Sequence, residues 1–113
     1  MDRNIRIYIS GRITKGDFKE NLKHFNNAQQ RLQAAGYDVI NPAKIGEVLP
    51  TLRHDEYMRV DEEYLRICDA IYMLDGYAES EGATEELNMA HNLGKTILYE
   101  TAGQEAVFNT VSD

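Results

Sequence analysis

The sequence predicts an α/β domain built around a parallel sheet, with helices on both faces. Short apolar runs that suit strands alternate with longer segments of helical periodicity along the chain. The run at 70–74 is apolar throughout, which is typical of a central parallel strand covered on both faces. At 113 residues the chain is long enough for one domain with a core and too short for two. We therefore expect one sheet of four or five strands with right-handed crossovers.

The first half of the chain has the pattern strand, helix, strand. Residues 5–10 are apolar at alternate positions, as expected of a strand. A helix is expected from Asp17, a good N-cap, to residue 35, and Gly36 should end it. Residues 37–41 then form the second strand of the prediction.

The second half continues the alternation. In order, we expect a loop at 43–53, a helix at 55–67, a strand at 70–74, a helix at 80–94, a strand at 95–99 and a short helix or arm at 102–113. Ser80 is a suitable N-cap for the last helix, and Gly94 should end it. Parallel sheets bind ligands at the carboxyl ends of their strands, so a site is expected there.

The composition fits a soluble protein without a nucleic-acid or membrane partner. A net charge of −7 disfavours a nucleic-acid polymer or an anionic membrane, although a local pocket can still hold a small anion. No apolar run approaches the about 20 residues of a membrane span, and no signal-peptide core is seen. The single Cys68 excludes an internal disulfide and fits a reducing compartment. We therefore expect a cytoplasmic protein.

Two carboxylates stand on helix faces that should be buried. Glu86 lies at the edge of an apolar stripe, three residues after Ala83 and four before Ala90. Glu85 points to the opposite side of that helix and should be solvated. Asp61 holds a position like that of Glu86 on the preceding predicted helix.

A buried carboxylate costs free energy unless it is paired or used in chemistry. In the structural interpretation, each carboxylate caps a backbone group or pairs with an arginine such as Arg12 or Arg66. In the functional interpretation, both face one site at the strand ends. Two such carboxylates suit chemistry on a glycosidic bond, where one attacks or stabilises the sugar and the other handles a proton.

The remaining motifs are less specific. The loop after the first strand has no dinucleotide or nucleoside-triphosphate motif, but Gly11, Arg12 and Lys15 suit either a phosphate seat or a solvated turn. The three histidines are scattered and Cys68 fits a core position, so we expect no metal and no cofactor.

Several motifs together resemble the nucleoside 2-deoxyribosyltransferase family. They are Ile7-Tyr8-Ile9-Ser10-Gly11, Asn41-Pro42, Asp61-x-x-x-Leu65-x-x-Cys68-Asp69-Ala70-Ile71, Leu74-Asp75-Gly76 and Ser80-x-Gly82-Ala83-x-x-Glu86-x-x-x-Ala90. The resemblance extends over residues 5–100 in the right order, is closest to short bacterial and phage members, and extends to the 2'-deoxynucleoside 5'-monophosphate N-glycosidases. It implies one Rossmann-like or flavodoxin-like domain across residues 1–113 and a homo-oligomer.

The resemblance also implies roles for individual residues. Glu86 matches the nucleophile, Tyr8 matches the tyrosine that orients it, and Asp61 matches the acid that protonates the departing base. Ser80 matches the serine that binds the 5'-phosphate in the monophosphate glycosidases. Glu81 departs from this pattern, because it puts a negative charge beside the phosphate seat.

The implied function is cleavage or exchange of an N-glycosidic bond in a (deoxy)nucleoside or its 5'-monophosphate, through a covalent glycosyl-glutamate. The residues expected to bind the substrate are Ser10, Gly11, Arg12, Lys15, Asn41, Asp75, Gly76, Ser80 and Gly82. Two alternatives stay open: a non-catalytic module that binds or senses a nucleotide in the same pocket, and a structural relative whose carboxylates only pair with arginines.

Overall fold

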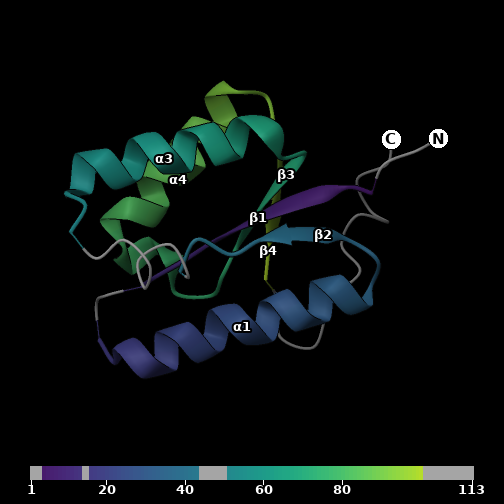
Figure 1. Cartoon of the computed structure of the whole chain (residues 1–113), viewed down its shortest axis with the longest axis horizontal. Coiled ribbons are helices and arrows are strands. Elements are labelled where there is room, and N and C mark those ends of the chain that lie inside the picture. The colour runs from purple at the N-terminus through teal and green to yellow at the C-terminus, as the bar shows by residue number, and fades with distance from the viewer. Residues whose placement is uncertain (1–3, 14–15, 44–50, 101–113) are drawn as a thin grey trace.

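The computed structural model describes residues 4–13, 16–43 and 51–100. Along the chain the elements are β1 (Arg6–Ser10), α1 (Phe18–Ala34), β2 (Asp38–Ile40), α3 (His54–Ile67), β3 (Ala70–Met73), the 3-10 turn η1 (Tyr77–Glu79), α4 (Glu81–Asn92) and β4 (Thr96–Tyr99) (Figure 1). Most of the predicted loop at 43–53 and the predicted helix or arm at 102–113 lie outside the described residues.

The sheet has four parallel strands in the order β2-β1-β3-β4 among the described residues. Ile7 of β1 is in register with Val39 of β2 on one side and with Ala70 of β3 on the other. Ile71 of β3 is in register with Ile97 of β4. The predicted parallel α/β fold is therefore confirmed, with β1 and β3 as the two central strands.

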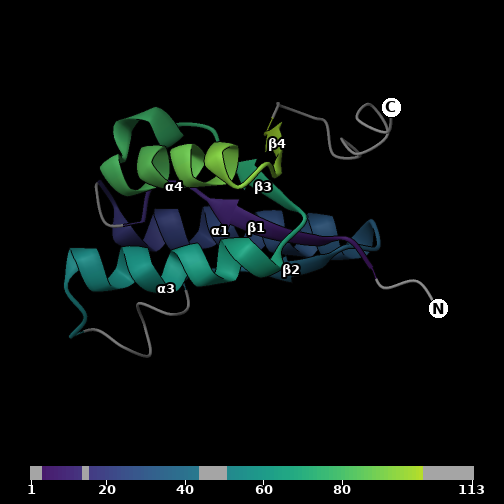
Figure 2. The same cartoon turned by 90° about the horizontal axis from the view of Figure 1, so that it is seen from above.

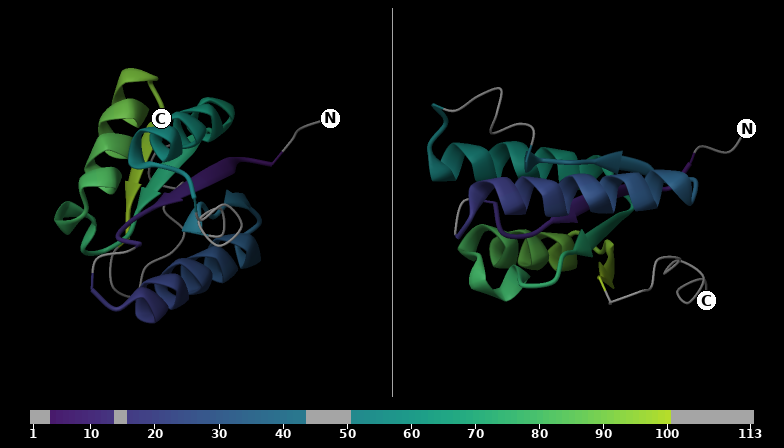
Figure 3. Two further views of the ribbon diagram at one scale, coloured as in Figure 1. Left: turned by 60° about the vertical axis from the view of Figure 1, so that its left-hand side comes forward. Right: turned by 90° about the horizontal axis from the view of Figure 1, so that it is seen from below.

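Helices cover both faces of this sheet, as predicted. Figures 1 and 3 show α1 by itself on one face, with α3 and α4 on the other. Side chains of β1 alternate between the faces: Ile7 and Ile9 pack with α1, whereas Tyr8 belongs to the cluster under α3 and α4. No helix of the described chain is long and apolar enough to pass through a bilayer.

The helix boundaries follow from local capping. The Asp17 side chain accepts hydrogen bonds from the first-turn N–H groups of α1, and the Ser80 side chain accepts one from the Ala83 N–H at 3.1 Å. Helix α4 ends two residues before Gly94. The φ of Gly94 is +73°, which lies in the left-handed region that glycine adopts readily. Most other predicted boundaries differ by one residue at an end, as is usual for frayed termini.

The helix starts and strand ends meet at one end of the molecule. Figure 2 shows α3 and α4 side by side, with their first turns at the end where β1 finishes. This is the edge at which the parallel topology predicts a ligand site.

Candidate active site

Glu86 lies in the second turn of α4 and is only 5% exposed. The predicted inward orientation of Glu86 is thus confirmed. The Tyr8 hydroxyl donates a hydrogen bond to Glu86 Oε2 at 2.8 Å, and the Ser10 hydroxyl donates one to Oε1 at 2.5 Å. Tyr8 and Ser10 are two residues apart on β1 and therefore face the same side of the sheet. A central strand thus fixes both oxygens of the carboxylate.

Asp61 of α3 is the second buried carboxylate and is 8% exposed. It lies close enough to Glu86 and Tyr8 to affect the ionisation of both. Burial and the adjacent Asp61 raise the pKa of Glu86 well above 4.5, and the hydrogen bonds from Ser10 and Tyr8 oppose this only in part. Burial, together with Glu86 and Asp61, likewise raises the pKa of Tyr8 well above 10.0.

Neither arginine suggested as a partner neutralises these carboxylates. The Arg12 guanidinium contacts Glu79 Oε1 at 2.5 Å, and Arg66 Nη2 contacts Glu62 Oε2 at 2.9 Å. Within residues 4–13, 16–43 and 51–100, no cation forms an ion pair with Asp61 or Glu86. The arginine-pairing interpretation is therefore wrong for this part of the chain, and the two carboxylates face each other instead.

Both carboxylates line a cavity of about 570 Å³, a volume typical of small-molecule sites. Its lining consists of Gly11, Ile13, Phe18, Pro42, Ala43, His54, Tyr57, Met58, Asp61, Glu79, Ser80, Glu81, Gly82, Ala83 and Glu86. These residues come from the loop after β1, the start of α1, the end of β2, α3, η1 and α4. The cavity thus lies at the carboxyl edge of the sheet.

The structure brings only part of the predicted substrate-binding set to this cavity. Gly11, Ser80 and Gly82 line it. Ser10 is completely buried, does not line the cavity and contacts Glu86, so its position suits holding the carboxylate rather than touching a ligand. Arg12 is held by Glu79 instead of lining the cavity.

Three other predicted residues, Asn41, Asp75 and Gly76, are not part of the lining. Lys15 lies outside the described residues. The Asn41 side-chain amide donates to Asn26 Oδ1 at 3.1 Å and to Gln29 Oε1 at 2.9 Å, which ties the end of β2 to α1. Asp75 and Gly76 stand apart, at the turn that follows β3.

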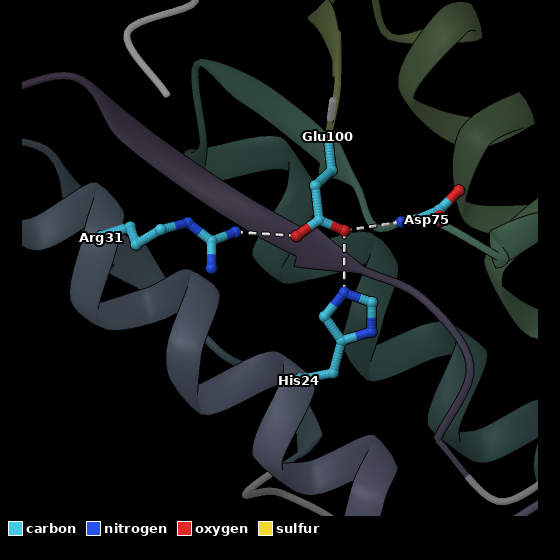
Figure 4. A network of polar contacts seen from close by, with 4 residues as sticks. All are labelled: His24, Arg31, Asp75 and Glu100. Carbon is cyan, nitrogen blue, oxygen red and sulfur yellow. Dashed lines mark hydrogen bonds and ion pairs between the residues drawn. The ribbon is translucent and has the colours of Figure 1, made fainter. Parts of the chain in front are cut away.

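The turn after β3 belongs to a separate polar cluster around Glu100 (Figure 4). Glu100 Oε1 accepts hydrogen bonds from the Asp75 N–H at 2.8 Å and from His24 Nε2 at 2.7 Å, and Oε2 contacts Arg31 Nη2 at 2.7 Å. Burial raises the pKa of Glu100, but the bonds from Asp75, His24 and Arg31 outweigh it and lower the pKa below 4.5. This cluster joins α1 to the end of β4.

Several lining residues were missed from the sequence. Phe18 fits the helical periodicity of α1, yet it is 44% exposed and lines the cavity. Tyr57 and Met58 precede Asp61 by four and three residues, so the helical spacing that placed Asp61 also places them beside it. His54 lines the mouth, where its Nε2 contacts Glu85 Oε1 at 2.9 Å.

Nothing in the described chain resembles a metal or thiol centre. No group of three or more His, Cys, Asp or Glu side chains is arranged to hold a metal ion there. Burial raises the pKa of the Cys68 thiol to about 11, as expected of a core cysteine.

The fold is similar to that of a solved enzyme. The CMP N-glycosidase BcmB of Clostridium botulinum matches with a TM-score of 0.59 at 17% identity, over 94% of this chain and 79% of that chain. A likeness at this identity establishes a common fold and no more. No curated protein sequence matches the chain. Residues 5–99 match the model of a domain of unknown function, DUF4406, and the chain therefore belongs to the DUF4406 family.

Proposed function

We propose that this protein cleaves or exchanges the N-glycosidic bond of a (deoxy)nucleoside or its 5'-monophosphate, with Glu86 as nucleophile. The observation that carries the proposal is a pair of adjacent buried carboxylates, Glu86 and Asp61, that open into a cavity without a cationic partner among the described residues. Such a pair is costly to bury, and catalysis accounts for its presence. The shared fold with a CMP N-glycosidase supports the same reaction class.

The reaction proceeds in two displacements. Glu86 attacks C1' of the sugar while the bond to the base breaks, and Asp61 donates a proton to the departing base. The product of this step is a glycosyl ester on Glu86. Water then hydrolyses the ester, or a second base takes the sugar, with its proton passing to Asp61. Both outcomes retain the configuration at C1'.

Two contacts of Glu86 favour the ionised form that this mechanism needs, against the opposing effects of burial and Asp61. Two carboxyl groups in contact share a proton over a range of pH, because the second ionisation places like charges side by side. The hydroxyls of Tyr8 and Ser10 donate to Glu86 and so favour the negative charge on that residue. Asp61 lines the same cavity, so its carboxyl group is placed to donate a proton to the departing base.

The apolar part of the lining provides a seat for the base. Phe18, Tyr57 and Met58 all line the cavity that holds the two carboxylates. Aromatic and thioether side chains bind the flat face of a base without selecting one base strongly. We therefore expect activity on more than one nucleobase.

The decisive experiment is capture of the covalent intermediate. The protein is incubated with a panel of deoxynucleosides and their 5'-monophosphates, base release is followed by chromatography, and quenched protein is analysed by mass spectrometry. We expect released base and a peptide containing Glu86 heavier by one glycosyl group. Glu86→Ala should abolish both signals, whereas Glu62→Gln, a neighbour of Asp61 on the exposed side of α3, should retain them.

Other outcomes would contradict the proposal. Ligand binding without base release, unaffected by Glu86→Ala, would instead support a nucleotide-sensing module. The homo-oligomer implied by the family resemblance is tested separately, by light scattering of the purified chain.

A further inference from the structure

We infer that the ligand of this cavity is an uncharged nucleoside rather than its 5'-monophosphate. The inference rests on the proposed function and narrows its substrate class. It follows from the charges of the lining, which contains the four carboxylates Asp61, Glu79, Glu81 and Glu86 and, among the described residues, no lysine or arginine. A phosphate group would enter a cavity whose walls already carry its own sign of charge.

The start of α4 is the natural place to test for an anion seat, because N–H groups and the helix dipole favour negative charge there. In this chain Glu81 is the first residue of α4 and itself lines the cavity, so a carboxylate already occupies the favourable end of the dipole. The Ser80 hydroxyl oxygen accepts the Ala83 N–H at 3.1 Å, and its own hydrogen can be donated to a sugar hydroxyl as readily as to a phosphate, so this residue does not favour the anion.

In the part of the chain that the structure describes, the basic side chains Arg12 and His54 beside the cavity both contact carboxylates. Arg12 contacts Glu79 at 2.5 Å, so binding a phosphate through its guanidinium would compete with this ion pair at the cavity wall. His54 at the mouth contacts Glu85, which gives that pair no excess positive charge for an anion. A neutral sugar avoids these costs, because its hydroxyl groups donate hydrogen bonds to carboxylate oxygens.

The test separates ligand class from catalysis by measuring binding. Calorimetry on Glu86→Gln, which should leave the ligand intact, compares one deoxynucleoside with its own 5'-monophosphate at low and at physiological ionic strength. We expect the nucleoside to bind roughly tenfold or more tightly. The ratio of nucleoside affinity to monophosphate affinity should fall as the salt concentration rises, because Glu79 and Glu81 lie at the exposed rim where ions screen their charge.

A charge-reversed variant sharpens the test. Glu81→Lys, made in the same Glu86→Gln background, should improve monophosphate binding and leave nucleoside binding nearly unchanged. Glu62→Lys applies the same charge change on the outer side of α3 and should leave the ratio of the two affinities unaltered.

The inference is overturned if the monophosphate binds as tightly as the nucleoside or more tightly, or if neither ligand binds. Failure of the proposed function gives a different result. In that case Glu86→Gln still prefers the nucleoside, but the unmutated protein releases no base from it.

Discussion

Two glutamates, the buried Glu86 and the partly buried Glu100, occupy opposite kinds of environment at the same end of the sheet. Glu100 receives an N–H, a histidine nitrogen and a guanidinium, and its pKa falls below 4.5 although burial alone would raise it. Glu86 receives two neutral hydroxyls and faces Asp61, and burial together with that neighbour raises its pKa well above 4.5. Burial raises the pKa of both carboxyl groups, and the partners decide whether that rise is outweighed, as at Glu100, or remains, as at Glu86.

The largest difference between the two glutamates should be in activity. Glu86→Gln removes the proposed nucleophile and should lower kcat for base release by about 10³-fold or more. Glu100→Gln leaves the cavity lining unchanged and should retain activity within about threefold at a temperature where the variant is folded. Steady-state base release by both variants checks this, and equal losses would remove the functional distinction between the two sites.

The next largest difference should be in stability, where Glu100→Gln should have a larger effect than Glu86→Gln. Glu100→Gln leaves Arg31 and His24 without their carboxylate and should lower the free energy of unfolding by about 2 kcal/mol. Glu86→Gln replaces an uncompensated buried acid by a neutral group and should leave stability unchanged or raise it. Urea denaturation followed by circular dichroism measures both, and a larger destabilisation by Glu86→Gln would contradict the comparison.

The pH dependence of stability should also differ in sign. The lowered pKa of Glu100 means that its contribution is present above pH 4.5 and is lost as the pH falls through the folded-state pKa. The raised pKa of Glu86 means that its contribution is fully present below pH 4.5 and is lost as the pH rises through the folded-state pKa. Relative to the unmutated protein, Glu100→Gln should lose less stability on acidification and Glu86→Gln less on alkalinisation. Urea midpoints over a pH series test both slopes.

The smallest effect is expected at Glu85, the sequence neighbour of Glu86. Its side chain is 44% exposed and its contact with His54 is a surface pair. Glu85→Gln should therefore change the free energy of unfolding by no more than about 0.5 kcal/mol. The same denaturation experiment supplies this value, and a loss comparable to that of Glu100→Gln would mean that exposure does not separate the three glutamates.

The local periodicities predicted the scaffold and the two central carboxylates. Alternating and continuous apolar runs gave the parallel strands, and three- and four-residue spacings placed Glu86 and Asp61 on buried faces. These features depend on short-range geometry, which a single sequence displays directly. The functional roles assigned to the two residues are still predictions.

The contacts across the fold were not predictable in the same way. The hydrogen bond from Ser10 to Glu86 joins residues 76 positions apart, and that from His24 to Glu100 spans the same separation. The pairing of Arg12 with Glu79, rather than with a ligand or a buried carboxylate, depends on where η1 brings its last residue. Periodicity carries no information about such partners, because the tertiary arrangement sets them.

The hydroxyls that donate hydrogen bonds to Glu86 belong to a central strand that is paired with another strand on each side. The rim of the cavity, in contrast, is formed by loops and by the first turns of helices. Substitutions at the rim can therefore accumulate without disturbing the hydrogen bonds that hold the Glu86 carboxylate. Proteins that descend from one ancestor can therefore come to bind different ligands through changes in these loops and helix starts, while Glu86 and its hydroxyl partners stay the same.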